Sequence, residues 1–350
     1  MDCRKEEKCD VSVIVPIHNG EAWIDDCFEA IQLQSAVEHL TVEVSAYDDS
    51  STDKTWDMLQ AWKEKLTMKG IKFVLSRNES SCPRGVGFAK NHAVEQSSGV
   101  FLCFQDVDDI MLPDRILHQY EAAQENENAI VGCEFRRLPD DSTVRFTRWA
   151  NSLDNEQLYH QIYTSHGPTL IMPTWFCKRS VFDRIGGFSE EGKGTPEDLL
   201  FFYKHLDIKG RLWKVPECLL VYRYHPHATT FSIDENTIWS VRLERLQENV
   251  LISWTEFTIW NAGKQGRRFY RSLQPKYQER VIAFCDVDVN KVGKTYTPPH
   301  QNKCMIPILH FTQMTPPVII CVKLDLTGGS FEENLKSLNL QEGRDYVLFS

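Results

Sequence analysis

Three carboxylates stand close together at the end of an apolar run, in the segment FLCFQDVDDI (residues 101–110). At this spacing Asp106, Asp108 and Asp109 repel one another, so either water or a cation must screen their charges. A solvated acidic loop needs no rigid support, whereas these residues follow a run that is typical of a buried strand. Alternating carboxylates suit a hard divalent ion, Mg²⁺ or Mn²⁺, which also takes phosphate oxygens. An EF-hand is excluded, because Met111 stands where that calcium loop requires glycine.

Polar residues follow two other apolar runs in the same way. Residues 11–17 (VSVIVPI) run into Asn19, and residues 42–47 run into Asp48 and Asp49. One interpretation is that an acidic residue after the second run caps the next helix. The other is that a carboxylate there accepts hydrogen bonds from a nucleobase or a ribose.

The elements around these clusters predict an α/β fold. Strand-like runs alternate with stretches of helical periodicity, which indicates a mostly parallel sheet with a ligand crevice at the carboxyl ends of its strands. Since the polar clusters all come directly after strands, we expect them to lie along one edge of the sheet and to form one site.

Three further candidates lie outside these clusters, and each has two interpretations. Glu197 and Asp198 either favour a helix N-terminus through its dipole or include a general base. His225 and His227 are either structural or metal ligands. Arg84 is either a surface charge or a phosphate contact.

Composition limits the class of protein. A length of 350 residues suggests two domains, and the net charge of −10 argues against nucleic acid as the main partner. Eleven cysteines without a CxxC pair indicate neither a disulfide framework nor a zinc ribbon, and we expect buried reduced thiols at Cys103, Cys218, Cys285 and Cys321. There is no signal-peptide pattern, and no apolar run approaches the about 20 residues that span a bilayer. We therefore expect a cytoplasmic protein with no membrane span.

Four motifs in order along the chain resemble a known family. They are VSVIVPIHN…W, YDDSSTDKT, RGVGFAKNHAVEQSSGVFLCFQDVDD and FDRIGGFSEEGKGTPEDLLF. Residues 11–230 are in this way similar to the inverting family 2 glycosyltransferases of GT-A fold. The resemblance implies a UDP-sugar donor, Mn²⁺ or Mg²⁺ as cofactor, and an acceptor hydroxyl whose identity it leaves open.

The resemblance also implies roles for the nucleotide-binding residues. Pro16 and Asn19 would lie at the nucleotide pocket. Asp49, with Asp48, would recognise uracil and ribose. Arg84 would contact the base or a phosphate.

The resemblance also implies which residues bind the metal ion. Asp106 and Asp108 would form the DXD motif, with Asp108 as the direct metal ligand and Asp109 supporting it. His225 or His227 would complete the metal site.

For catalysis, the resemblance makes Asp198 the base and places Glu197 beside it on the acceptor side. Two substitutions depart from the family pattern. His18 replaces the usual aromatic residue before Asn19, and Ser50 replaces the usual glycine after the two aspartates.

Two alternatives from other classes remain open. An apolar strand followed by DVDDI nearly matches the motif of haloacid-dehalogenase-like phosphatases, in which Asp106 would be a nucleophile and Asp108 an acid. That motif normally opens its domain, whereas two strand–helix units precede it here. The second alternative is a sensor that binds a nucleotide-sugar without catalysis.

The C-terminal region begins a new strand–helix–strand pattern. Its N-x-G-x-x-G segment has Asn261 in place of the first glycine, followed by Gly263 and Gly266, and Asp286 follows at a spacing of about 20 residues. This resembles a degenerate Rossmann-type nucleotide-binding unit. Either it is a second nucleotide site, or it is a small α/β domain that binds nothing.

We therefore predict a GT-A glycosyltransferase domain followed by a small Rossmann-like α/β domain. The expected boundaries are a polar tail over 1–10, the transferase domain over 11–235, a connecting helix over 236–253 and the Rossmann-like domain over 254–350.

Overall fold

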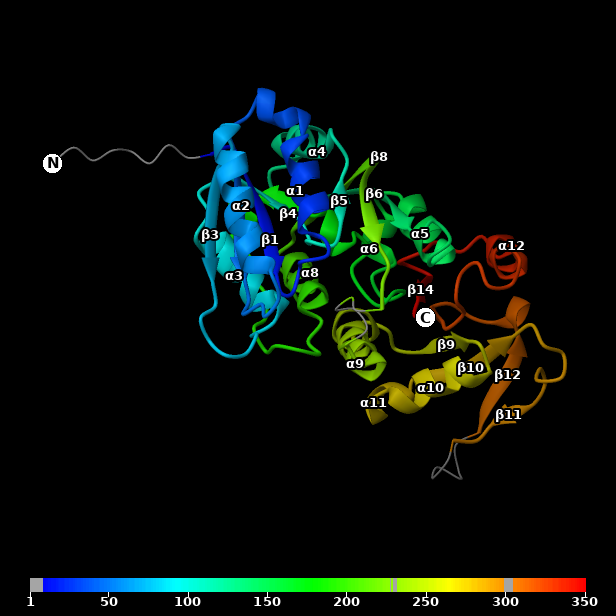
Figure 1. Cartoon of the computed structure of the whole chain (residues 1–350). Coiled ribbons are helices and arrows are strands. Elements are labelled where there is room, and N and C mark those ends of the chain that lie inside the picture. The colour runs from blue at the N-terminus through cyan, green and yellow to red at the C-terminus, as the bar shows by residue number, and fades with distance from the viewer. Residues whose placement is uncertain (1–8, 227, 229–231, 299–304) are drawn as a thin grey trace. The chain divides into compact units, whose positions relative to one another are not determined.

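The computed structural model describes residues 9–226, 228, 232–298 and 305–350. The chain folds into two compact units (Figure 1). Unit 1 comprises residues 1–155 and 167–234, and unit 2 comprises residues 156–166 and 235–350. No helix in the described ranges combines the length and apolar character that crossing a bilayer requires.

Unit 1 contains an eight-stranded mixed sheet with the order β3-β2-β1-β4-β7-β6-β8-β5. Its strands are β1 (Val11–Ile17), β2 (Val42–Asp48), β3 (Lys72–Arg77), β4 (Phe101–Phe104), β5 (Ile110–Met111), β6 (Ala129–Leu138), β7 (Phe176–Lys178) and β8 (Arg211–Arg223). Strands β1 to β4 pair in parallel, as expected for alternating strands and helices. The other half is mixed, because β7 runs antiparallel to both β4 and β6, and β5 runs antiparallel to β8.

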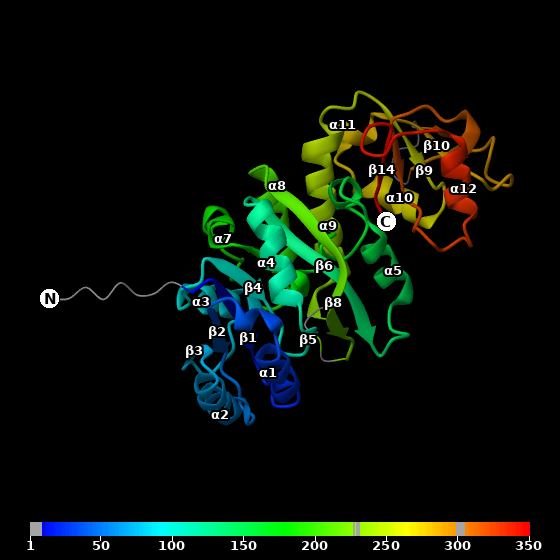
Figure 2. The same cartoon turned by 90° about the horizontal axis from the view of Figure 1, so that it is seen from above.

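Helices cover both faces of this sheet. They are α1 (Ile24–Gln32), α2 (Thr55–Met68), α3 (Val86–Glu95), α4 (Arg115–Glu125), α5 (Val144–Ser152), α7 (Arg179–Ile185) and α8 (Glu197–Asp207). Residues of α1, α2 and α4 share one apolar core with alternate residues of the central strands, such as Val11, Val13 and Val15. Helices α7 and α8 lie on the opposite side of the sheet from α1 and α2 (Figure 2).

The register brings the polar clusters to one edge of the sheet. In the parallel pairing of β1 with β2, Ile17 lies beside Asp48, and in the pairing of β1 with β4, Ile14 lies beside Phe104. The residues that follow each of these strands therefore emerge at the same edge, as the sequence predicted.

Unit 2 contains a six-stranded sheet with the order β11-β12-β10-β9-β13-β14, in which only β11 is antiparallel to its neighbour. Its strands are β9 (Phe257–Trp260), β10 (Val281–Asp286), β11 (Thr295–Tyr296), β12 (Ile306–His310), β13 (Val318–Ile320) and β14 (Tyr346–Leu348). Its helices are α6 (Gln157–His160), α9 (Glu235–Leu246), α10 (Lys264–Ser272), α11 (Pro275–Gln278) and α12 (Ser330–Ser337). A π-helical turn over Gln247–Leu251 extends α9.

The cysteines of the described ranges are free thiols. Cys103, Cys285 and Cys321 are buried as expected, but the expectation is wrong for Cys218, which is exposed. It lies beside an irregularity in the pairing of β6 with β8. The prediction that Cys218 is buried rested on its apolar neighbours in the sequence, and these neighbours do not cover its side chain in the structure.

Glu43 ties together the amino-terminal ends of the central strands, opposite the edge that carries the polar clusters. Its buried carboxylate accepts hydrogen bonds from Ser12 Oγ (2.6 Å), from Ser98 Oγ (2.9 Å) and from the Ser98 and Gly99 amides, and Lys72 Nζ lies 2.9 Å away. Burial raises the pKa of Glu43, but these donors outweigh burial and lower it to about 2.

This carboxylate should make stability depend on pH. Its pKa is lower in the folded chain than in the unfolded chain, so its contribution of about 3 kcal/mol is complete above its ordinary pKa and is lost as pH falls toward 2. Glu43→Gln should therefore lower the free energy of unfolding at pH 7 by a similar amount, and by much less at pH 3. Urea unfolding at both pH values measures this, with Glu64→Gln on the exposed side of α2 as the control. A loss that is equal at the two pH values would contradict the assigned ionisation.

Candidate active site

The three aspartates after β4 form a compact cluster. One oxygen each from Asp106, Asp108 and Asp109 lies within 4.8 Å of the others. Asp109 is buried, and its Oδ1 accepts a hydrogen bond from the Arg223 amide (2.9 Å) at the end of β8. Its Oδ2 is buried and has no hydrogen-bond partner within the described ranges. A cluster of carboxylate oxygens with an unsatisfied buried acceptor matches the donor set of a hard divalent ion.

A buried scaffold behind this cluster holds its backbone. Gln105 Nε2 donates to the carbonyl oxygens of Asp106 (2.8 Å) and Asp109 (2.9 Å). Arg115, which is fully buried in α4, donates from Nη1 to Gln105 Oε1 (2.7 Å) and from Nη2 to the Phe104 carbonyl (2.8 Å). Sequence reasoning missed both residues, because no local pattern indicates that an arginine will be buried.

The cluster is short of positive charge. Burial is the main cause that raises the pKa of Asp106 to about 6; Asp108 and Glu197 raise it further, while Lys90 and Arg115 lower it. Burial and the two neighbouring aspartates raise the pKa of Asp109 well above its ordinary value. Raised pKa values of carboxyl groups near the end of a strand are typical of a site that binds a cation or a proton during function.

His225 lies beside the cluster. Its Nε2 is 2.9 Å from Asp108 Oδ2, and its ring centroid is 5.0 Å from that of Trp23. Of the two histidines that the sequence singled out, His225 is therefore next to the aspartates. His227 lies outside the described residues.

Asp48 and Asp49 are both buried and already accept hydrogen bonds from the protein. Asp48 Oδ1 accepts from the Ser51 amide (3.0 Å). Asp49 Oδ1 accepts from Asn78 Nδ2 (2.8 Å), and its Oδ2 accepts from the amides of Arg84 (2.8 Å) and Gly85 (2.7 Å). Asp49 thus holds the loop that leads from β3 to α3. The sequence singled out Asp49 and Arg84 but not Asn78, which also donates to Asp49.

The other predicted nucleotide residues lie along the same edge. Pro16 is buried in β1, where it pairs with Tyr47 of β2. Asn19 has a positive φ of 53° and accepts a hydrogen bond from the Thr52 amide (2.9 Å). The Arg84 guanidinium lies 3.9 Å from the centroid of the Phe88 ring, and the Arg84 side chain is 53% exposed.

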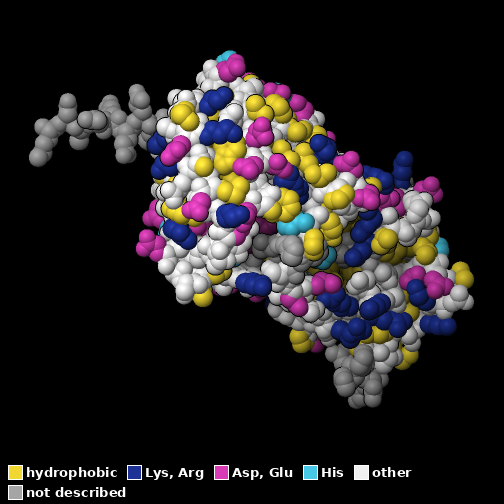
Figure 3. Space-filling view, in the orientation of Figure 1, with side chains coloured by type: hydrophobic (Ala, Val, Ile, Leu, Met, Phe, Trp, Pro, Cys, Tyr) yellow, Lys and Arg dark blue, Asp and Glu magenta, His cyan; other side chains and the backbone are white. Residues whose placement is uncertain are grey.

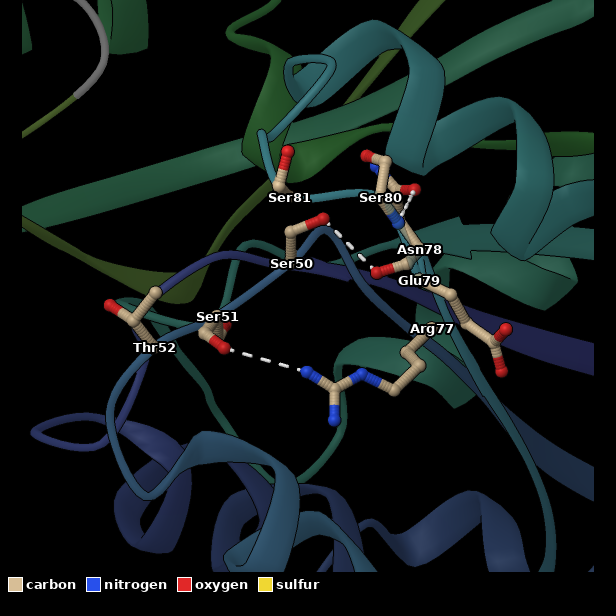
Figure 4. Close-up of a pocket in the computed structure, with 8 residues that line it drawn as sticks. All are labelled: Ser50, Ser51, Thr52, Arg77, Asn78, Glu79, Ser80 and Ser81. Atoms are coloured by element: carbon tan, nitrogen blue, oxygen red, sulfur yellow. Dashed lines mark hydrogen bonds between the residues drawn. The ribbon is translucent and has the colours of Figure 1, made fainter.

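A polar cavity of about 370 Å³ opens beside Asp48 and Asp49 (Figure 4). It lies between the segment after β2 and the segment around the end of β3, which are joined by a hydrogen bond from Ser50 Oγ to the Asn78 carbonyl (3.0 Å). Its lining is rich in hydroxyl groups and consists of Ser50, Ser51, Thr52, Arg77, Asn78, Glu79, Ser80 and Ser81.

Glu197 and Asp198 begin helix α8. Glu197 Oε1 lies 3.1 Å from Nζ of Lys90, and both side chains are buried. Asp198 Oδ1 accepts from the Leu199 amide (2.6 Å). A Cβ on Gly167 would lie 3.6 Å from Asp198 Oδ2, so the absence of a side chain at Gly167 leaves space next to that oxygen.

Asp198 and the aspartate cluster influence each other. Burial is the main cause that raises the pKa of Asp198 to about 7; Glu197 and Asp106 raise it further, while Lys90 and the Leu199 amide lower it. The charge at the end of β4 therefore acts on the start of α8, although Asp106 and Asp198 are far apart in the sequence. The sequence did not single out Lys90, which lies in the RGVGFAKNHA motif.

Gly263 and Gly266 belong to unit 2, at the start of α10. The Ala262 amide donates to Asp286 Oδ2 (3.0 Å) and the Gly263 amide to Asn261 Oδ1 (2.8 Å), so both amides have partners within the protein. A Cβ on Gly266 would lie 1.9 Å from the Asn261 carbonyl oxygen, so close packing of the helix against the strand requires glycine there.

Comparisons with known proteins agree with the geometry of unit 1. In the protein EpsJ of Bacillus subtilis, described as an uncharacterized glycosyltransferase, 23% of 225 aligned residues are identical, covering 63% of this chain and 62% of EpsJ. An uncharacterized glycosyltransferase of Rickettsia typhi is 25% identical over 255 residues, covering 69% of this chain and 74% of the relative.

A solved structure shares the fold. The crystal structure of residues 1–349 of TarS from S. aureus, in complex with UDP-GlcNAc, has a TM-score of 0.53 at 19% identity. The similarity covers 68% of this chain and 66% of the TarS chain.

A protein-family model identifies the first half of the chain. The model for glycosyl transferase family 2 matches residues 12–186, which include β1 except its first residue, β2 to β4, and the cluster of Asp106, Asp108 and Asp109. The match favours the transferase interpretation of these aspartates over the phosphatase one. Because it covers half of the 350 residues, this chain belongs to glycosyl transferase family 2.

Proposed function

We propose that this protein is an inverting, metal-dependent glycosyltransferase that moves a sugar from a UDP-sugar to an acceptor hydroxyl. One observation carries the proposal. Three aspartates after β4 bring one oxygen each within 4.8 Å of the others, with His225 2.9 Å from Asp108, and the charge of Asp106 acts on Asp198 at the start of α8. A cluster suited to a cation beside a carboxylate suited to take a proton is what transfer from a nucleotide-sugar requires.

Asp108 and His225 are the residues that we propose to hold the ion, with Asp106 beside them. The distance of 2.9 Å between Asp108 and His225, together with the unsatisfied Oδ2 of Asp109, supports this assignment. A bound Mn²⁺ or Mg²⁺ would neutralise charge that develops on the diphosphate leaving group. Asp109 supports the site by fastening the cluster to the Arg223 amide at the end of β8.

Asp198 is the proposed general base. Its raised pKa of about 7 makes it a better proton acceptor near neutral pH than an ordinary aspartate, and Gly167 leaves space beside its Oδ2 for an acceptor hydroxyl. The acceptor oxygen would lose its proton to Asp198 as it attacks the anomeric carbon. Attack from the face opposite the diphosphate inverts that carbon.

The cavity beside Asp48 and Asp49 is the proposed site of the nucleoside. Its hydroxyl groups and the Arg77 guanidinium offer donors to a base and a ribose, and Asp49 accepts a hydrogen bond from its lining residue Asn78 (2.8 Å). We further propose that the chain is related to the β-1,3-N-acetylglucosaminyltransferase-like proteins of animals and that N-acetylglucosamine is the sugar. UDP-GlcNAc, which is present in the TarS structure, is therefore the first donor to test.

The metal should control donor binding. We expect UDP to bind at least about tenfold more weakly in EDTA than with Mn²⁺, because without the ion the diphosphate faces unneutralised carboxylates. Asp108→Ala should lower the affinity measured with Mn²⁺ to the value in EDTA. Calorimetric titration measures both, and Asp57→Ala on the exposed face of α2 is the control. Equal affinity of the wild type with and without Mn²⁺ would refute the metal role.

The base should be visible in the dependence of rate on pH. Asp198 accepts a proton only when it is deprotonated, so the rate of UDP release from UDP-GlcNAc should rise with pH through about 7 and level off above it. Asp198→Asn should keep donor affinity and lower the rate by about 10²–10⁴-fold, because the amide cannot take the proton. Release of UDP by this variant at the wild-type rate would remove Asp198 from the mechanism.

Unit 2 has a proposed Rossmann-like nucleotide site of its own, at Gly263 and Gly266. Lys and Arg side chains gather over α10 (Figure 3), whose sequence KQGRRFYRS supplies positive charge for an anion. Against this, the amides of Ala262 and Gly263 already donate within the protein, so a diphosphate would have to displace those bonds.

A variant at Gly263 separates the two interpretations of unit 2. A Cβ there would lie 2.8 Å from Asn261 Oδ1 and would disturb the loop that a diphosphate would contact. If unit 2 binds a nucleotide, Gly263→Ala should abolish one of two binding events in a titration with UDP and leave the one that depends on Mn²⁺. A wild-type titration with one UDP per chain, lost entirely in Asp108→Ala, would mean that unit 2 has no such site.

A further inference from the structure

Lys90 is a buried cation at the centre of the acidic site of unit 1. It lies in α3, its side chain is 3% exposed, and its Nζ lies 3.1 Å from Glu197 Oε1. The same Nζ is 5.3 Å from the centroid of the Phe188 ring. Glu197 is its one hydrogen-bond acceptor among the residues that the structure describes. An ammonium group without water is costly unless a nearby carboxylate compensates it, so Lys90 and Glu197 depend on each other.

The face of α3 that carries Lys90 is fastened to the segment that precedes α8. Asn91, one residue on, accepts from the Phe188 amide (2.9 Å) and donates to the Phe188 carbonyl (3.0 Å) and to Glu190 (2.8 Å). A Cβ on Gly87, one turn before Lys90, would lie 2.1 Å from the Ser189 carbonyl oxygen. Helix α3 therefore contacts this segment closely along one face, and the ion pair of Lys90 with Glu197 completes the contact at the first residue of α8.

The charge of Lys90 acts on both acidic groups of the site. The charged residues that act on Asp198 are its neighbour Glu197, Lys90 from α3 and Asp106 from the end of β4. Of these three, only Lys90 is positive, and it lowers the pKa of Asp106 as well. Among these charged residues, Lys90 is thus the cation that acts on both Asp198 and Asp106, while Arg115 acts on Asp106 as well.

We propose that Lys90 is a positioning residue for the transfer reaction: by its ion pair with Glu197 it fixes the start of α8, and with it Asp198, against the aspartates that follow β4. This inference rests on the proposed role of Asp198 as the base. It assigns to the lysine of the RGVGFAKNHA motif a role in orienting the proton acceptor, without contact to the substrate.

The test compares pH–rate profiles of four proteins. The wild type, Lys90→Met, Lys90→Arg and the double variant Lys90→Met/Glu197→Gln are assayed with Mn²⁺ for UDP release. The probe is whichever of UDP-GlcNAc, UDP-glucose, UDP-galactose and UDP-GalNAc the wild type turns over fastest. Lys90→Met should raise the pH at which the rate is half-maximal by about one unit and lower kcat at pH 7 by about tenfold, with the donor KM within about twofold of the wild type.

The other two variants separate charge from packing. Lys90→Arg keeps the positive charge and should restore the wild-type pH profile. The double variant removes a group that lowers the pKa of Asp198 together with one that raises it, so its profile should move back toward the wild type while kcat stays low. Because it removes both members of the ion pair and so leaves no Glu197 carboxylate without its partner, it also keeps the test valid if Lys90→Met folds poorly. Lys204→Met, at the exposed end of α8, is the control and should match the wild type.

The outcomes distinguish this inference from the proposed function. If Asp198→Asn abolishes UDP release but the profile of Lys90→Met coincides with that of the wild type, the positioning role is overturned and the proposed function stands. If Asp198→Asn keeps the wild-type rate, the proposed base fails and this inference fails with it. A loss of rate in Lys90→Met with no shift in its profile and no rescue by arginine would reduce Lys90 to a structural residue.

Discussion

The repulsion among carboxylates at one edge of a sheet is the constraint on which the rest of unit 1 depends. Asp106, Asp108 and Asp109 after β4 and the acid pair at the start of α8 share a partly buried space, in which like charges interact strongly. The fold answers this repulsion in two ways. Gln105 and Arg115 hold the backbone of the cluster rigidly from behind, and Lys90 supplies one positive charge between the two groups of acids.

The pKa values of acidic residues at the two ends of the central strands show the effect of incomplete charge neutralisation. Glu43, at the amino-terminal ends, has a donor for each of its oxygens, and its pKa falls to about 2 despite burial. Asp106, after β4, and Asp198, at the start of α8, are half-buried but have fewer donors and cations, and their pKa values rise to about 6 and about 7. These acids thus differ from Glu43 because the protein itself supplies Glu43 with enough donors, whereas it does not do so for Asp106 and Asp198.

The start of α10 in unit 2 has its amides and its acidic residue paired within the protein. The amides at the start of α10 donate to Asp286 and to Asn261, and Asp286 also pairs with Lys291 (3.0 Å). A parallel sheet with a glycine-containing turn is therefore compatible with a closed, self-satisfied domain as well as with a nucleotide site. The motif by itself therefore does not distinguish these two interpretations of unit 2.

Much of the fold and part of the site were predictable from local pattern alone. Apolar runs followed by polar residues located β1, β2 and β4, and parallel pairing carried Asn19, Asp49 and Asp106 to one edge. The motif resemblance found the same family as the comparison over residues 12–186. These features could be predicted because strand periodicity and the motifs depend only on residues that are close together in the sequence.

Only the tertiary structure decided how the site is supported. Lys90 meets Glu197 across a separation of 107 residues, and Arg115 is buried against Gln105 and the backbone of β4. The sequence likewise did not predict the antiparallel pairing in one half of the sheet or the exposure of Cys218. These four features have one physical reason. The contacts and the burial of a side chain depend on which helices and strands pack against each other. The hydrophobic periodicity of a single helix or strand does not indicate which other element it packs against.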